Sequence, residues 1–190
     1  MTRIECLKKE LADETAKQEQ ITNAFGTEFA DPDLTARCIQ LTADIKALEA
    51  EAVKAEKANK LISDIMETAG LQYLPEEKVW VSGKYPRGWD YNTSDTLRLS
   101  VETQGYTTAT IAAVWDPNND INNAVGKNIL TFSLDGNYAY VLKQTGFDHL
   151  LKNIGGDNPE FRKAELKWML SQIEAILKQQ GYKPVAADTL

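Results

Sequence analysis

The sequence predicts an α+β protein, in which an N-terminal antiparallel helical hairpin resembling a coiled coil precedes a small antiparallel β-sheet packed by a C-terminal helix. Residues 1–70 are rich in Ala, Glu and Lys, and their apolar residues recur in steps of three and four, as in helices. Residues 71–190 contain all four Trp and several short β-branched runs between turn residues. We therefore expect two domains: 1–70, a candidate dimerisation element, and 71–190, the sheet with its helix.

The first helix is expected to begin at a capping box and to end at a glycine. Thr2 can accept from the backbone of Glu5 while the Glu5 side chain reaches back, and Gly26 suits a helix terminus. The apolar stripe between them, which also carries Glu14 and Gln18, consists of Ile4, Leu7, Leu11, Ile21 and Phe25.

A second, longer helix is predicted from about Pro32 to Ala69, with Asp31 as its N-cap and a proline at its first position. Its stripe alternates steps of four and three, which is the heptad pattern of a coiled-coil seam. The stripe consists of Leu34, Cys38, Leu41, Ile45, Leu48, Ala52, Ala55, Asn59, Ile62 and Met66.

The two predicted helices differ in length by roughly 20 Å at 1.5 Å per residue. The part of the stripe from Ala52 to Met66 therefore outruns the first helix and needs another cover. Either the C-terminal domain or a second subunit in a homodimer could cover this part of the stripe. In a dimer Asn59 would specify the register; otherwise it is a polar residue at the edge of the seam.

The two cysteines, Cys6 and Cys38, are expected to be free thiols. Their positions on the hairpin differ by roughly 20 Å along its axis, which exceeds the ~7 Å Cα separation that a disulfide tolerates. The N-terminus lacks an apolar signal-peptide core, and no apolar run approaches the ~20 residues of a membrane span. We therefore expect a reduced, cytoplasmic protein with no membrane contact.

The second domain is expected to contain four or five antiparallel strands, with Asp135-Gly136-Asn137 as a hairpin turn and Leu74-Pro75-Glu76-Glu77 as a joint after the hairpin. A short helix is expected at 147–151, and the tail 185–190 is expected to fray. A final helix starts at Asn158-Pro159 and ends at Gly181, with Phe161, Trp168, Ile173 and Leu177 facing the sheet. The predicted strands are 79–81, 97–103, 107–115, 129–134 and 138–142.

No sequence motif of an enzyme is present. The single histidine, His149, has no evident partner for general-base catalysis. The segment 116–122 imitates the first half of a calcium loop, but Ile121 replaces the turn glycine and Lys127 the bidentate glutamate. We read it as an Asn/Asp-rich turn, and we predict no metal and no cofactor.

The most suggestive segment is 84–92, in which Tyr85, Arg87, Trp89 and Tyr91 occupy a turn-forming stretch. Tyr, Trp and Arg supply most interface hot spots, and they can also stack a nucleobase with Arg on a phosphate. Alternatively, the aromatic rings fold inward as a lid on the sheet.

The tip of the hairpin is a second candidate site, because Glu28 and Asp31 flank Phe29. An acidic tip of this kind could enter a basic channel. Acidic residues at a helix N-terminus are also ordinary capping chemistry.

These patterns predict a non-enzymatic interaction protein that docks on another macromolecule as an inhibitor, adaptor or chaperone. A small-ligand, nucleotide-like binder is the alternative, and an enzyme without a recognisable motif is the third class. The formal net charge of −7 argues against a long nucleic acid as partner, although residues 1–70 carry −5 of it and residues 71–190 only −2. A protein partner is therefore expected, together with a candidate homodimer through the helices.

Overall fold

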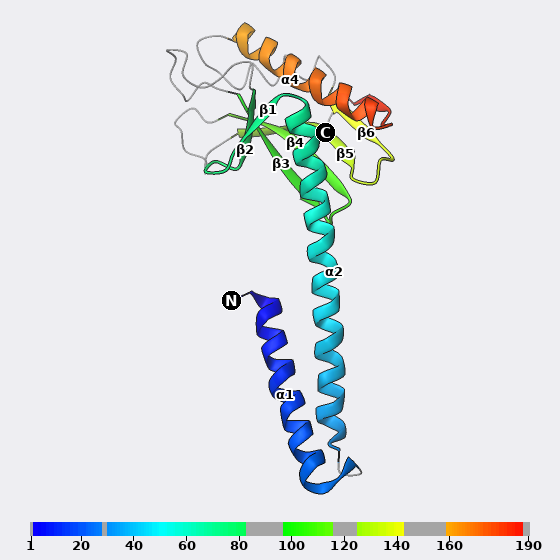
Figure 1. The fold of residues 1–190 in the computed structure, drawn as a ribbon. Coiled ribbons are helices and arrows are strands. Elements are labelled where there is room, and N and C mark those ends of the chain that lie inside the picture. The colour runs from blue at the N-terminus through cyan, green and yellow to red at the C-terminus, as the bar shows by residue number, and fades with distance from the viewer. Residues whose placement is uncertain (1, 28–29, 83–96, 116–124, 143–158, 188–190) are drawn as a thin grey trace. The chain divides into compact units, whose positions relative to one another are not determined.

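The computed structural model describes residues 2–27, 30–82, 97–115, 125–142 and 159–187, and it confirms the α+β class. The chain begins with helix α1 (Arg3–Phe25) and the longer helix α2 (Pro32–Thr68) (Figure 1). Packing divides the chain into two compact units, the hairpin unit (Met1–Lys57) and the sheet unit (Ala58–Leu190). Composition changes at Gly70, but the packing boundary falls earlier, inside α2.

The helix ends follow the capping chemistry that the sequence predicts. The Thr2 side chain accepts a hydrogen bond from the Glu5 backbone N–H, and the Glu5 carboxylate accepts one from the Thr2 N–H, so both halves of the capping box form. Gly26 ends α1 with a positive φ of 98°. Asp31 caps α2: its Oδ1 accepts from the backbone N–H of Asp33 at 2.9 Å and of Leu34 at 3.2 Å.

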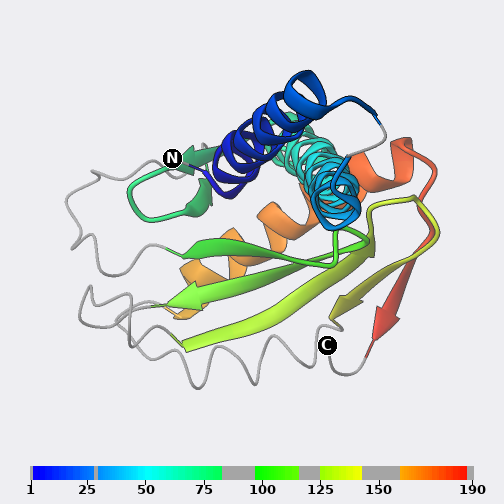
Figure 2. The same ribbon diagram turned by 90° about the horizontal axis from the view of Figure 1, so that it is seen from below.

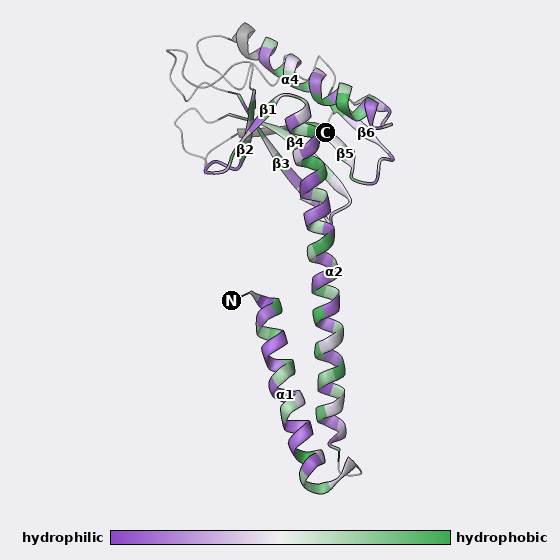
Figure 3. Cartoon of the chain, in the orientation of Figure 1, coloured by the Kyte–Doolittle hydropathy of each residue, from purple (hydrophilic) through white to green (hydrophobic). Residues whose placement is uncertain are grey.

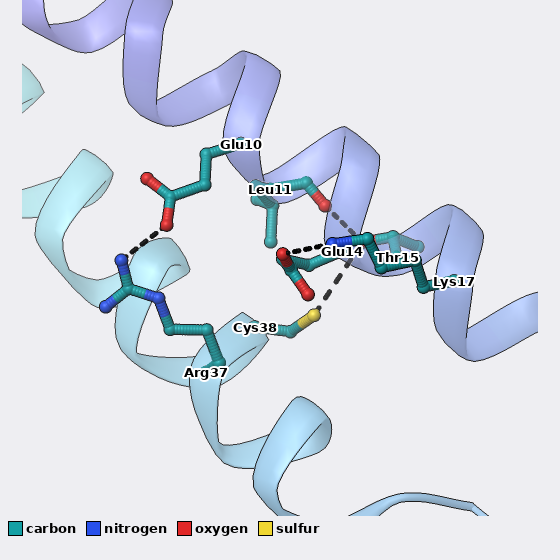
Figure 4. A network of polar contacts seen from close by, with 7 residues as sticks. All are labelled: Glu10, Leu11, Glu14, Thr15, Lys17, Arg37 and Cys38. Atoms are coloured by element: carbon teal, nitrogen blue, oxygen red, sulfur yellow. Dashed lines mark hydrogen bonds and ion pairs between the residues drawn. The ribbon is translucent and has the colours of Figure 1, made fainter.

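Within the hairpin unit, α1 and α2 are antiparallel neighbours joined by polar contacts between the helices (Figure 4). The Lys8 ammonium lies 2.7 Å from the Glu49 carboxylate, Thr15 contacts the Cys38 sulfur at 4.0 Å, and the Gln18 amide donates to Thr35 at 3.3 Å. Arg37 of α2 also pairs with Glu10 of α1. Both cysteines are free thiols, as expected.

The apolar seam of this hairpin is thin. Among its described residues only Leu41 and Ile45 are buried, whereas the α1 stripe from Ile4 to Ile21 is half-buried. Phe25, which we expected on the α1 stripe, is exposed instead. It is the last residue of α1, where the seam ends.

The C-terminal turns of α2 belong to the sheet unit. Ile62 and Met66, two of the residues whose cover the sequence left open, are buried in its core together with Ile65 and Ala69. The C-terminal domain therefore covers this end of the stripe. Earlier on the stripe Ala52 is exposed and Ala55 half-buried, and Asn59 is exposed as well.

The sheet has seven strands in sequential order, and helix α4 (Pro159–Gln179) lies across one face of it (Figure 2). Six strands form an antiparallel meander, and the seventh pairs in parallel with the sixth. The strands are β1 (Leu71–Leu74), β2 (Val79–Ser82), β3 (Arg98–Gln104), β4 (Thr108–Trp115), β5 (Val125–Ser133), β6 (Ala139–Leu142) and β7 (Pro184–Ala187).

Three sequence predictions about this sheet were wrong. The sheet has seven strands rather than the expected four or five. Residues 74–77 are not a joint after the hairpin: β1 and β2 pair with each other, and the turn between them closes at Lys78 with a φ of 54°. The tail is not frayed at its start, because Pro184–Ala187 forms the edge strand β7. A parallel neighbour needs a crossover connection, and α4 lies in the connection from β6 to β7. The expected helix at 147–151 lies outside the described residues.

A single apolar core holds the sheet unit together. It combines Leu99, Ile111 and Leu130 from central strands with Leu166 and Ile173 from α4. Each such side chain contributes roughly 1.5–3 kcal/mol on burial. Trp168 packs at the margin of this core, whereas the side chain of Phe161 lies outside the described residues.

Candidate interaction surface

The two faces of the sheet differ sharply in chemistry. Residues that pair directly across neighbouring strands point to the same face. Leu99 pairs with Ala113, Ile111 with Leu130, and Phe132 with both Ala109 and Ala139, so these buried side chains share the face that packs on the helices. A β-bulge at Ile111/Ala112 lets the consecutive residues Ile129 and Leu130 both be buried.

On the opposite face the register aligns one residue from each of five strands. Glu102 pairs with Thr110, Thr110 with Thr131, Thr131 with Tyr140, and Tyr140 with Val185. We call this set the Thr–Tyr row. All five side chains reach solvent: Glu102 is exposed, both threonines are half-exposed, and Tyr140 and Val185 are 44% and 55% exposed.

Hydrogen bonds and ring contacts hold the row in place. The Thr110 and Thr131 hydroxyls lie 3.2 Å apart, so one donates to the other across β4 and β5. The Tyr138 hydroxyl bonds to the Thr108 hydroxyl at 2.8 Å, which fixes the ring of Tyr138 against the sheet. That ring in turn lies beside Tyr140, with centroids 5.3 Å apart and an interplanar angle of 34°. Tyr140 is thus exposed yet supported, so little side-chain entropy remains to be lost on binding.

The C-terminal edge of the row is secured from the other side of the sheet. Tyr182 is buried, and its hydroxyl donates to the Ser133 carbonyl oxygen at 2.8 Å. Its ring meets Phe132 edge-on, with centroids 5.9 Å apart. Burial raises the pKa of Tyr182 above its ordinary value, and the negative charge of Asp135 adds to the shift. Tyr182 therefore stays neutral and keeps its donor at physiological pH.

Two buried charged residues, Arg98 and Glu165, lie elsewhere in the sheet unit. The Arg98 guanidinium, at the start of β3, lies 3.2 Å from the Glu77 carboxylate in the β1–β2 turn, so it ties that turn to the sheet. Glu165 is buried on α4. Neither belongs to the Thr–Tyr row.

Most residues that the sequence singled out for binding lie outside the described residues. These are Tyr85, Arg87, Trp89 and Tyr91 in the aromatic segment, and Glu28 and Phe29 at the tip of the hairpin. Asp31 is described, and its carboxylate serves as the N-cap of α2. His149 and the segment 116–122 also lie outside the described ranges.

Sequence reasoning overlooked the Thr–Tyr row, although part of its signal was readable. In the strand predicted at 138–142, Tyr138 and Tyr140 alternate with Ala139 and Val141, which predicts one polar and one apolar face. The pairing of Tyr140 with Val185 could not be predicted, because the sequence analysis expected the tail to fray. A row across five strands is a property of register, which pattern alone does not specify.

The described parts of the chain show neither a metal site nor a membrane span. No group of three or more His, Cys, Asp or Glu side chains within them could hold a metal ion. None of their helices combines the length and apolar character needed to cross a bilayer. No family model, no curated protein and no solved structure matches this chain.

Proposed function

We propose that this protein is a non-enzymatic interaction protein that docks on another protein, as an inhibitor, adaptor or chaperone. The observation that carries the proposal is the Thr–Tyr row: an ordered, solvent-facing line of side chains on the sheet face opposite the helices. Tyr is enriched at the centres of protein interfaces because its ring buries a large area while its hydroxyl still bonds.

The chemistry of the row favours a protein over a phosphate backbone. Its one charged side chain is Glu102, so it repels rather than attracts phosphates. Threonine hydroxyls and a tyrosine ring suit the mixed polar and apolar surface of a protein partner. We place this activity in the reducing cytoplasm, where the free thiols of Cys6 and Cys38 stay reduced. Self-association through the helices is a separate proposal and is argued below.

The experiment replaces Tyr140 by a photo-reactive phenylalanine analogue and cross-links the full-length chain in cells of its host. Tyr106, 40% exposed in the β3–β4 turn and outside the row, is the matched control position. We expect one dominant protein adduct from position 140 and none of that adduct from position 106. A partner retained in pull-downs by Tyr106→Ser but lost by Tyr140→Ser supports the same conclusion.

Other outcomes would contradict the proposal. Equal cross-linking from both positions means that the row is not an interface. A small molecule that co-purifies in stoichiometric amount, with no protein partner, would favour the ligand-binding alternative.

A further inference from the structure

Helix α2 carries an apolar stripe and, on nearly the opposite side, a second stripe that is apolar except for Lys46. The first stripe, which contains Leu41 and Ile45, packs on α1. A second stripe follows its own steps of three and four, and every member of it is exposed; it consists of Ala36, Ile39, Ala43, Lys46, Ala50 and Val53. Ile39 precedes Leu41 by two residues, so their side chains diverge by about 200° around the helix. Apolar residues accordingly recur along the whole of α2 (Figure 3).

This outer stripe leaves large aliphatic side chains in water. Ile39 is 66% exposed and Val53 is 49% exposed, and they lie two heptads apart on the same face. The apolar core within the hairpin is too small to offset this exposed apolar surface, because α1 has no buried residue. Two helices with so thin a seam are marginal in water, and an exposed heptad stripe is the usual contact surface for another helix.

We propose that the outer stripe of α2 pairs in antiparallel orientation with the same stripe of a second copy of this chain. The stripe has alanine at every first position of its heptads and a larger side chain at every fourth. In one antiparallel register each alanine therefore faces a larger residue. Ala36 meets Val53 of the second copy, Ile39 meets Ala50 of the second copy, and Ala43 meets Lys46 of the second copy.

Charge and packing favour this arrangement over a parallel pair. In a parallel pair, Lys46 would face Lys46 of the second copy in the same layer, and alanines would face alanines across voids. In the antiparallel register the Lys46 stem covers Ala43 of the second copy, and its ammonium extends to solvent. Small and large side chains then alternate along the seam, as close packing requires.

The length of the helix matches the same register. Pairing Ile39 with Ala50 places Pro32, the first residue of α2, opposite Lys57 of the second copy. Lys57 is the last residue of the hairpin unit, so the overlap uses all of α2 that lies within that unit. The inference rests on the hairpin unit and does not depend on the function proposed for the Thr–Tyr row.

Sedimentation equilibrium of the full-length chain provides the first test. We expect a mass of twice 21.2 kDa. Ile39→Glu should weaken dimerisation at least tenfold without loss of helical circular dichroism. The control Ala16→Glu, at an exposed position of α1, should leave dimerisation unchanged. A wild-type chain that stays monomeric at its highest soluble concentration would overturn the proposal, as would a dimer that Ile39→Glu and Val53→Glu both leave intact.

Disulfide trapping tests the register. Ile39→Cys and Ala50→Cys are made separately in a background with Cys6→Ser and Cys38→Ala, oxidised alone and then mixed. We expect a cross-linked dimer only in the mixture, because each new cysteine lies about 16 Å along the axis from its own copy in the antiparallel pair. Self-cross-linking of each variant alone indicates a parallel pair, and no cross-link in any sample indicates a different seam. Either result contradicts the proposed register.

Discussion

The Tyr182 hydroxyl donates to the carbonyl oxygen of Ser133 across 2.8 Å, joining the segment that leads into β7 to the end of β5. This bond bridges 49 positions of sequence. Ser133 is itself a hub, because its own hydroxyl accepts from the backbone N–H of Asn137 at 2.6 Å and of Tyr138 at 3.0 Å. The same residue thus organises the β5–β6 turn and anchors the last strand.

Tyr182→Phe should lower the free energy of unfolding by about 1 kcal/mol, because a buried carbonyl loses a hydrogen-bond partner while the ring keeps its packing. The measurement is urea unfolding followed by tryptophan fluorescence. Tyr106→Phe, at an exposed turn position, is the control and should change the unfolding free energy little. Equal effects of the two substitutions would contradict the role assigned to the hydroxyl.

The same tyrosine predicts a pH dependence. Burial, and then the charge of Asp135, raise the pKa of Tyr182 above its ordinary 10.0 in the folded chain. A raised pKa favours the neutral form, so its contribution is complete below pH 10.0 and is lost as the pH rises through the folded-state pKa. Above pH 10.0 the wild type should therefore lose stability more steeply than Tyr182→Phe. Parallel stability curves of the two proteins would disprove this.

The hydroxyl pair between Thr108 and Tyr138, which holds Tyr138 beside Tyr140, can be tested by a double-mutant cycle. Thr108→Val and Tyr138→Phe each remove one partner of the 2.8 Å hydroxyl pair, and each should cost roughly 1 kcal/mol. The double variant should cost less than the sum, with a coupling of about 0.5–1 kcal/mol. Additive losses in chemical unfolding would show that the pair contributes nothing beyond its separate packing.

The end of α2 depends on backbone conformation at one glycine. Gly70 has a φ of +80°, and a Cβ there would lie 3.6 Å from the ring of Trp168, which is an ordinary contact. Gly70→Ala should therefore cost about 1–2 kcal/mol through conformational strain rather than steric overlap. Gly70→Asn should lose less, because asparagine tolerates this conformation better. Equal losses for both variants would point to crowding instead.

Met66 and Leu41 lie on one helix but in two units, which predicts different consequences of truncation. Met66→Ala empties part of the sheet core and should cost about 2–5 kcal/mol in fluorescence-detected unfolding, because all four tryptophans lie after residue 70. Leu41→Ala should instead speed amide hydrogen exchange in α1 and the first turns of α2, with a small change in the fluorescence transition. A shift of that transition as large as for Met66→Ala would mean that the units unfold together.

Local patterns sufficed for the elements that local chemistry determines. The capping box at Thr2, the terminator Gly26 and the cap at Asp31 all form as predicted, because each depends on neighbouring residues. The turn at 135–137 also formed where its residues predicted it, with Gly136 at a φ of +88°.

Elements that depend on distant partners escaped prediction. Strand β7 is short and begins with a proline, so its sequence pattern is that of an unstructured tail. Its pairing with β6 and the Tyr182 bond to Ser133 are contacts with distant residues. Strand β1 was hidden for a similar reason, because Leu71–Leu74 pairs with residues beyond a proline that resembled a domain joint. The Thr–Tyr row needed all of these pairings at once.

Helix α2 starts in one compact unit and ends inside the core of the other. The two helices therefore cannot be removed or exchanged as a separate module without cutting into the core of the sheet unit. A fragment that begins at residue 71, where composition changes, would leave behind Ile62, Ile65, Met66 and Ala69 and expose the apolar surface that they cover. Such a fragment is expected to aggregate. Recombination or engineering that transplants the sheet must therefore carry the last eleven residues of this helix, Ala58 to Thr68, with it.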